Sequence, residues 1–168
     1  LSVIDEMPAG RKPTKTWLVS EEKRESSYHW LADELLANKA QAIVVCPFID
    51  PSEHLAFENV ASATETFATM QEFMQKQHPG LRLGLLHGRQ KKKEQSAVIE
   101  DLYAGEIDIL VTTPMVEVGL DLKRASIIAL EAAERFGMAS LHQLRGRLGR
   151  ANQQGYCLLV SNANSLNS

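Results

Sequence analysis

Short runs of consecutive apolar residues alternate along this chain with longer stretches in which apolar residues recur every three or four positions. A short apolar run is typical of a strand that is buried on both faces, whereas the wider spacing gives a helix one apolar side. The runs predict strands over Lys15–Val19, Ala42–Ile49, Leu81–Leu86, Ile107–Val111, Ala125–Leu130 and Gly155–Val160. The intervening stretches predict helices over 21–39, 51–77, 92–104 and 140–150.

This alternation of strands and helices predicts a three-layer α/β fold, in which a mostly parallel sheet carries helices on both faces. In such sheets, ligands bind beyond the carboxyl ends of the strands. Polar segments follow the predicted strands that end at Leu86 and Val111, and another accompanies the helix that starts near Ser140. We therefore expect the functional residues at that edge of the sheet.

The composition fits one globular domain. The chain has 168 residues, of which 44% are hydrophobic and 23% charged, and these values exclude intrinsic disorder and a disulfide scaffold. Both cysteines, Cys46 and Cys157, lie in apolar runs and are expected to be buried thiols. No apolar stretch approaches the ~20 residues that cross a bilayer. Asp5 and Glu6 argue against a signal peptide, so we expect a cytoplasmic protein with no membrane partner.

The net charge of −3 gives no overall positive field, so any nucleic-acid site must be local. The segment over 143–150 is the strongest candidate for such chemistry, because it holds three arginines and two glycines. Arg147 and Arg150 are three residues apart and share one helix face, so both guanidinium groups can converge on one anion. The alternative is a solvated basic helix end, in which Gln143 only completes a capping box with Ser140. Capping explains neither glycine.

The loop over 113–121 follows a predicted buried strand and offers a hydroxyl, a glycine and a carboxylate, at Thr113, Gly119 and Asp121. A hydroxyl and free backbone amides suit phosphate binding, and a carboxylate suits ribose hydroxyls. An ordinary turn is an equally fair interpretation of this loop.

A basic segment follows the predicted strand that ends at Leu86. It consists of His87, Gly88 and Arg89, and three lysines follow over 91–93. Three lysines in the first turn of a helix oppose the helix dipole, which indicates contact with a polyanion. A solvated run of charge explains them as well.

These segments together resemble the motifs of superfamily 2 helicases: 143–150 resembles motif VI, 113–121 resembles motif V, and His87-Gly88 resembles the phosphate-contacting segment before them. The resemblance narrows to the RecG family of ATP-dependent DNA helicases through Ile4–Arg11, Gly105–Val111 and Glu134–Gly137. It implies the second RecA-like motor domain, a P-loop NTPase-type fold, with a connector over 1–15 and the helicase C-terminal domain over 16–168.

The resemblance also implies roles. Arg147 and Arg150 would be catalytic arginine fingers for ATP with Mg²⁺, which the preceding RecA-like domain of the same chain would mainly bind. Gln143 would couple the nucleotide to the cleft between the domains, and Gly119 and Asp121 would contact the ribose side.

The same resemblance assigns His87, Gly88, Arg89 and Thr113 to the backbone of branched or forked DNA, in recombination and replication-fork repair. No metal-ligand set is indicated within this chain. Two departures from the family are visible: Pro114 replaces an expected threonine, and Lys92 replaces a common proline.

No Gly-x-x-x-x-Gly-Lys-Ser/Thr loop (Walker A) occurs in the chain, so we expect no ATPase activity from it alone. Related motors, the transcription-repair coupling factor and the replication-restart helicase, share the arginine segment and are alternatives. The coupling factor usually has tyrosine where this chain has His142. A further alternative is a non-catalytic relic of the fold that only binds nucleic acid. Such a relic would have no reason to keep the arginine pair with Gln143.

Overall fold

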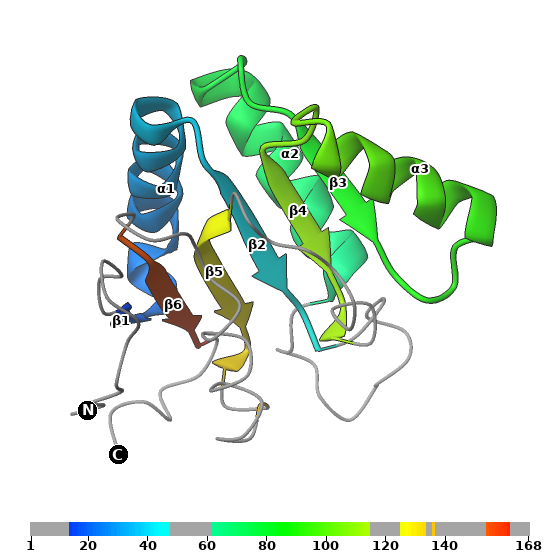
Figure 1. Ribbon diagram of the computed structural model, residues 1–168. Coiled ribbons are helices and arrows are strands. Elements are labelled where there is room, and N and C mark those ends of the chain that lie inside the picture. Colours follow the sequence, from blue (N-terminus) through cyan, green and yellow to red (C-terminus); the bar gives the residue numbers. More distant parts are fainter. Residues whose placement is uncertain (1–13, 48–61, 115–124, 134–135, 137–153, 162–168) are drawn as a thin grey trace.

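The computed structural model describes residues 14–47, 62–114, 125–133, 136 and 154–161. In these residues the strands and helices alternate as the apolar pattern predicts (Figure 1). The elements are β1 (Lys15–Val19), a short 3-10 helix η1 (Glu21–Lys23), α1 (Arg24–Asn38), β2 (Gln41–Val45), α2 (Ala63–Gln77), β3 (Leu83–Leu86), α3 (Lys92–Tyr103), β4 (Ile109–Thr112), β5 (Ala125–Glu131) and β6 (Tyr156–Val160).

The six strands form one sheet in the order β1-β6-β5-β2-β4-β3, and every pair of neighbouring strands runs parallel. The predicted parallel α/β fold is therefore confirmed. Since all strands point the same way, their carboxyl ends lie along one edge of the sheet (Figure 1). The edge strands are β1 and β3.

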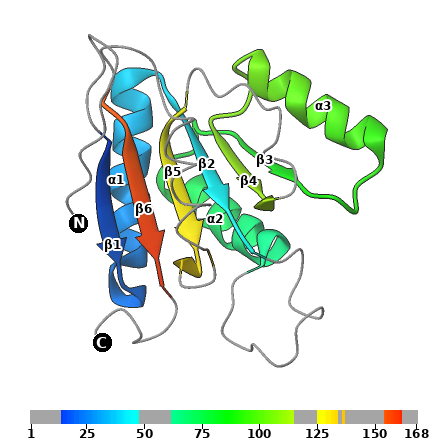
Figure 2. The same ribbon diagram turned by 60° about the horizontal axis from the view of Figure 1, so that its bottom comes forward.

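Alternating side chains of the strands pack into two separate cores, one on each face of the sheet. In β2, Ala42 and Val44 belong to the core that α1 and α2 cover, whereas Ile43 and Val45 belong to the core that α3 covers. Figure 2 shows α1 and α2 behind the strands. Because both faces are buried, all five residues of β2 are buried, and the four that follow Gln41 are apolar.

The helix predicted over 51–77 is wrong as one continuous helix. Ser62 is extended, with φ −113° and ψ 159°, and α2 begins after it at Ala63. The Ser62 hydroxyl accepts a hydrogen bond of 3.2 Å from the Glu65 amide, so this serine caps the helix. Ser62 and Glu65 have the spacing of a capping box, a signal that the apolar pattern alone does not reveal.

Two further boundaries have local causes. β2 ends at Val45 rather than at the predicted Ile49, ahead of Pro47, which has no amide hydrogen for the strand ladder. After α3, Gly105 adopts φ 80°, the left-handed conformation that glycine tolerates, and this confirms the predicted closure of that helix. The helix predicted over 140–150 lies outside the described residues.

Candidate functional site

The sheet brings together two of the predicted contact segments. Leu86 of β3 is in register with Thr112 of β4, so His87 and Thr113 follow directly at the carboxyl edge of neighbouring strands (Figure 1). The Thr113 amide donates a hydrogen bond of 3.3 Å to the Leu86 carbonyl oxygen, which extends the pairing beyond both strands. His87 and Gly88 are half-buried, and Arg89 is exposed.

Two glutamine side chains hold the turn that contains His87. The Gln90 side chain accepts from the His87 amide at 3.0 Å and donates to the Leu85 carbonyl oxygen at 2.9 Å. Gln95, in α3, donates to the His87 carbonyl oxygen at 2.8 Å. The Arg89 amide donates to His87 Nδ1 at 3.2 Å, so this ring nitrogen is an acceptor. The backbone of the turn is thereby fixed against both β3 and α3.

The sequence interpretation missed this role of Gln90 and Gln95. A side chain that binds nearby backbone follows no periodicity, so the apolar pattern contains no trace of it. The only available signal was local: polar residues that can donate and accept lie within and just after a turn that leaves a strand.

Thr113 occupies a buried position, with 3% of its surface exposed. Its Oγ1 atom has no hydrogen-bond partner among the described residues, whereas the neighbouring Thr112 hydroxyl donates to the Thr113 carbonyl oxygen at 3.2 Å. A buried hydroxyl without a partner carries a desolvation cost. Thr113 thus keeps an unused donor beside the His87 turn.

A buried ion pair lies farther along the same edge, and the sequence interpretation missed it too. The Glu131 carboxylate, at the end of β5, is 1% exposed and binds the Arg24 guanidinium from the start of α1. Arg24 also binds Glu21 at 2.9 Å. Burial by itself lowers the pKa of Arg24, but the facing Glu131 and the hydrogen bonds to Glu21 and Glu131 outweigh it and raise that pKa. Arg24 therefore stays charged. A glutamate that ends an otherwise apolar run was the available signal.

The remaining predicted site residues lie outside the described residues: Gly119, Asp121, Gln143, Arg147 and Arg150. Within the part of the chain that is described, no three His, Cys, Asp or Glu side chains gather as a metal site would require. Over the same residues, no helix has the length and apolarity that a bilayer crossing needs.

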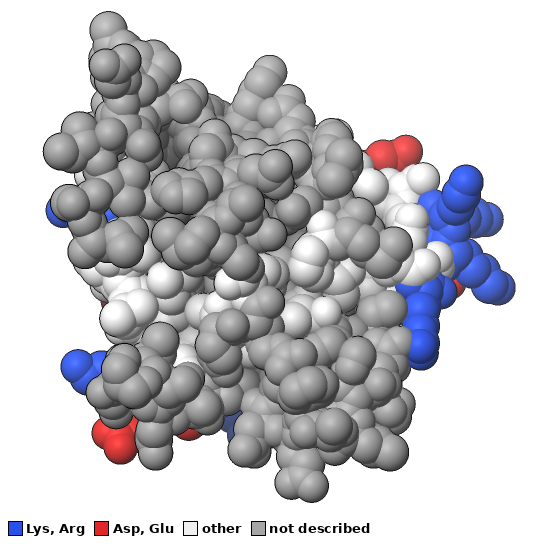
Figure 3. Space-filling view, turned by 90° about the horizontal axis from the view of Figure 1, so that it is seen from below, with Lys and Arg blue, Asp and Glu red and all other residues white. Residues whose placement is uncertain are grey.

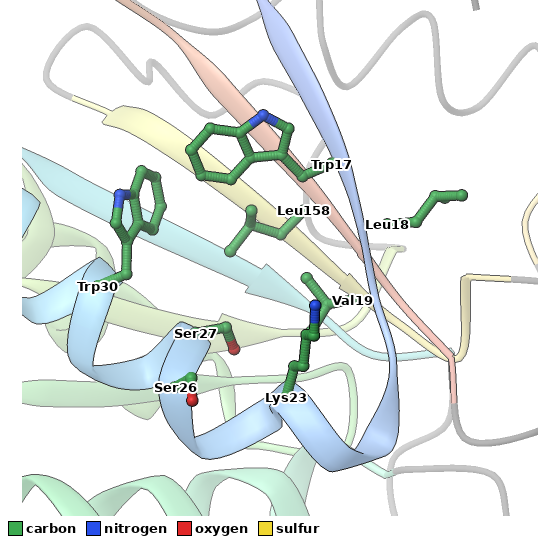
Figure 4. Close-up of a pocket in the computed structure, with 8 residues that line it drawn as sticks. All are labelled: Trp17, Leu18, Val19, Lys23, Ser26, Ser27, Trp30 and Leu158. Atoms are coloured by element: carbon green, nitrogen blue, oxygen red, sulfur yellow. The ribbon is translucent and has the colours of Figure 1, made fainter.

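A hollow of about 300 Å³ lies between β1 and α1, away from the β3–β4 edge (Figure 4). Its walls are mainly apolar, and Trp17 and Trp30 meet edge to face across it with ring centroids 4.8 Å apart. Leu18 also borders the hollow, but its side chain points to the other side of β1, as strand alternation requires (Figure 4). None of the predicted site residues lines this hollow.

Comparison with known proteins shows the family to which this chain belongs. The model of the helicase conserved C-terminal domain matches residues 26–152. The ATP-dependent DNA helicase RecG of Thermotoga maritima is 44% identical over 161 residues, which are 95% of this chain and 20% of the relative. RecG of Pasteurella multocida is 42% identical over 159 residues, covering 95% of this chain and 22% of the relative. The chain thus spans about a fifth of the length of these relatives.

Solved structures agree with this assignment. A RecG structure bound to a three-way DNA junction superposes with a TM-score of 0.68 at 38% identity, covering 93% of this chain and 19% of that one. The second domain of the DEAD-box helicase Mss116p, solved on an RNA duplex, reaches a TM-score of 0.64 at 14% identity, over 89% of this chain and 54% of that one; it shares the fold. Because the family model matches most of its length, this chain belongs to the helicase conserved C-terminal domain family, with RecG helicases among its relatives.

Proposed function

We propose that this chain is the second motor domain of a longer ATP-dependent DNA helicase that acts on branched DNA in recombination and replication-fork repair. The observation that carries the proposal is the similarity to RecG, at about 40% identity over nearly the whole chain but only a fifth of the relative. The structure of RecG on a three-way DNA junction supports branched DNA as the substrate class.

The nucleotide roles fall to residues outside the described part of the chain. Arg147 and Arg150 reach the γ-phosphate of a nucleotide that the preceding domain holds, Gln143 couples it to the interdomain cleft, and Gly119 and Asp121 meet the ribose. The chemistry of these side chains fits ATP: guanidinium groups match phosphate oxygens, and a carboxylate matches ribose hydroxyls. ATP with Mg²⁺ would supply the γ-phosphoryl group, and its transfer to water would drive the motor. The arginines contribute positive charge where negative charge develops in the transition state.

The DNA roles fall to the turn at the β3–β4 edge. His87, Gly88 and Arg89 meet the sugar-phosphate backbone there, and Thr113, at the end of the neighbouring strand, is the fourth residue assigned to this contact. The fixed backbone of this turn supports the assignment, because a rigid grip on phosphates costs little ordering entropy when DNA binds. Opening and closing of the two motor domains moves this grip along the strand.

The test is Arg150→Ala in the full-length helicase, measured as steady-state ATPase activity with forked DNA. The guanidinium acts mainly in the transition state, so kcat falls by something on the order of 10³-fold while KM for ATP changes far less. Arg150→Lys rescues poorly, because a point charge cannot reproduce the planar fork.

The matched control is Arg82→Ala. Arg82 is an exposed arginine at the opposite, amino edge of the sheet, where it pairs with Glu106 and Asp108. Its removal leaves kcat near the wild-type value. An Arg150→Ala enzyme that melts like wild type and keeps more than about a third of its kcat, a loss under ~1 kcal/mol of barrier, contradicts the arginine-finger role.

A further inference from the structure

Two histidines meet at the surface of the helices that cover one face of the sheet. His29 lies within α1, and His78 is the C-cap residue of α2. The Nδ1 atom of His29 lies 3.0 Å from the Nε2 atom of His78, although 49 positions separate the two residues in the sequence. The fold thus brings two imidazole rings together from two different elements.

Packing and backbone contacts hold both rings in place. Phe73 of α2 packs edge to face against His29, with ring centroids 4.8 Å apart. The His78 amide donates to the Met74 carbonyl oxygen at 2.7 Å, and the His78 carbonyl oxygen accepts from the Leu81 amide at 3.1 Å. The pair is therefore arranged before a ligand arrives, which lowers the ordering cost of binding.

The surroundings of the pair suit a cation. His29 is exposed, and Glu25 and Asp33 lie four residues before and after it, on the same side of α1. His78 precedes β3 and so lies at the amino edge of the sheet, whereas Figure 3 shows Lys and Arg side chains gathered at one side of the carboxyl face. Lys76, the cation nearest to His78 in the sequence, forms an ion pair within α2.

The distance between the two nitrogen atoms fits a shared metal ion. Bonds from a metal to imidazole nitrogen are about 2.0–2.1 Å long, so two nitrogens 3.0 Å apart subtend an angle of about 90–100° at a common ion. Neighbouring ligands make such an angle in the square-planar or tetragonal coordination of Cu²⁺, whereas tetrahedral coordination needs a wider one. A rotation of each ring aims both lone pairs at the ion. Each ring then carries its proton on the outer nitrogen, Nε2 of His29 and Nδ1 of His78.

We propose that His29 and His78 form an exchangeable binding site for Cu²⁺, which joins α1 to the end of α2. Neutral imidazoles bind the later first-row transition metals, Cu²⁺ the most tightly, whereas Mg²⁺ and Ca²⁺ prefer oxygen ligands. Among the described residues no third His, Cys, Asp or Glu side chain completes the set, so water fills the remaining positions. The site is separate from the nucleotide and DNA contacts and does not depend on the proposed function.

The test is calorimetric titration of the 168-residue chain with Cu²⁺, in a buffer that contains glycine as a weak competing chelator and excess Mg²⁺. We expect the pair to bind one Cu²⁺ per chain, and the electron paramagnetic resonance spectrum of the bound copper to show two imidazole nitrogens. His29→Gln and His78→Gln each weaken binding at least about tenfold, because one imidazole alone forms no chelate. Each single variant shows one imidazole nitrogen at most.

Thermal melting gives a second readout of the same site. The two imidazoles lie close together only in the folded chain, so Cu²⁺ at about 100 times its Kd stabilises the wild type and raises Tm by about 5 °C. The variants His29→Gln and His78→Gln lose this gain. Their Tm without copper shows whether they fold, which separates the loss of a metal ligand from a loss of structure.

The matched control is His87→Gln, which removes an imidazole whose Nδ1 atom accepts a hydrogen bond from the Arg89 amide. It keeps the copper affinity and the gain in Tm. If the wild type and the double variant His29→Gln/His78→Gln bind Cu²⁺ equally, or if excess Mg²⁺ displaces the copper, the pair is not the metal site. Wild-type copper with fewer than two imidazole nitrogens contradicts the proposal as well. Neither result bears on the proposed function.

Discussion

Arg24 and Glu131 join the start of α1 to the end of β5, and their burial decides how much this pair contributes to stability. An exposed pair such as Lys76 and Glu72 on α2 contributes only about 0.3–0.5 kcal/mol, because water and salt screen it. Removing one partner of a buried pair costs about 3–5 kcal/mol, because the other charge is left without compensation. Glu131, with 1% exposed, belongs to the second kind, so the pair fixes the carboxyl edge near β5.

Tyr28 is also buried, and the charges of Arg24 and Glu131 affect its pKa. Burial, followed by the charge of Glu131, raises the pKa of Tyr28 from 10.0 to about 12. Below pH ~10 the phenol is neutral in both the folded and unfolded states. Between pH ~10 and ~12 only the unfolded state releases the proton, so the free energy of unfolding falls, by about 2–3 kcal/mol in total. We expect Tyr28→Phe to remove this part of the alkaline loss, as measured by denaturant unfolding at pH 9, 10 and 11.

The matched control is Tyr103→Phe, at an exposed tyrosine on α3, and it retains the wild-type fall in stability with pH. Tyr28→Phe also loses the contact with Arg24, so its stability at pH 8 is lower; only the slope against pH reports the ionisation. Parallel curves for wild type and Tyr28→Phe between pH 10 and 11 would show that Tyr28 does not titrate in this way.

At the scale of the elements, β3 and the segment before β4 approach so closely that one position excludes a side chain. A Cβ atom at Gly84 would lie 2.6 Å from the Cδ1 atom of Ile107 and 3.3 Å from its Cγ1 atom. Gly84 is buried in β3, and Ile107 is buried in the core that α3 covers. The outermost methyl of Ile107 thus fills the space that other residues would need at position 84.

This contact predicts coupling between the two positions. Gly84→Ala costs about 1–3 kcal/mol because it overpacks the strand, and Ile107→Val costs about 0.5–1.5 kcal/mol because it removes a buried methyl. The double variant costs less than the two together, by about 1 kcal/mol, since the clashing methyl is gone. Urea unfolding of the four proteins in this cycle measures the coupling, and strictly additive costs would contradict the close approach.

Most elements were predictable because burial on both faces makes each central strand a continuous apolar run. β4 and β5 are fully buried along their lengths, and both were predicted close to their observed bounds. The start of α2 was not predicted, because it depends on one local hydrogen bond, in which Ser62 caps the helix. Apolar residues recur at helical spacing on both sides of Ser62, so the apolar pattern shows no interruption there.

The sequence predicts the candidate site as a list of residues, but it does not predict how the described ones are arranged. His87 and Thr113 are neighbours only because β3 pairs with β4, and this pairing is a property of the strand order. Local patterns do not specify that order. The glutamines that fix the His87 turn, and Arg24 with Glu131, act through contacts between distant segments, so their roles follow from the fold alone.

At the scale of the whole molecule, the sequence lacks some of the groups that phosphoryl transfer needs. It has the arginines that we propose for the γ-phosphate, but no Gly-x-x-x-x-Gly-Lys-Ser/Thr loop to bind the phosphates. We therefore predict that the 168-residue chain hydrolyses no ATP above a mock preparation, with or without forked DNA, in a coupled ATPase assay. The full-length helicase, assayed beside it, is active. DNA-stimulated hydrolysis by the short chain would mean that the roles assigned to the two domains are wrong.

The pairing of β1 with β6 has a consequence for how the chain folds during synthesis. Among the described strands β1 comes first in the sequence, yet the strand it pairs with is β6, the last of them, since Lys15 is in register with Tyr156. The residues between Lys15 and Tyr156 must all leave the ribosome before this pair can form, and such distant pairing is slow. Until then β1 presents Trp17 and Leu18 on opposite sides of an unpaired strand, and both remain partly exposed even in the finished fold. The nascent chain is therefore most prone to aggregation, and most in need of a chaperone, in the interval before β6 arrives.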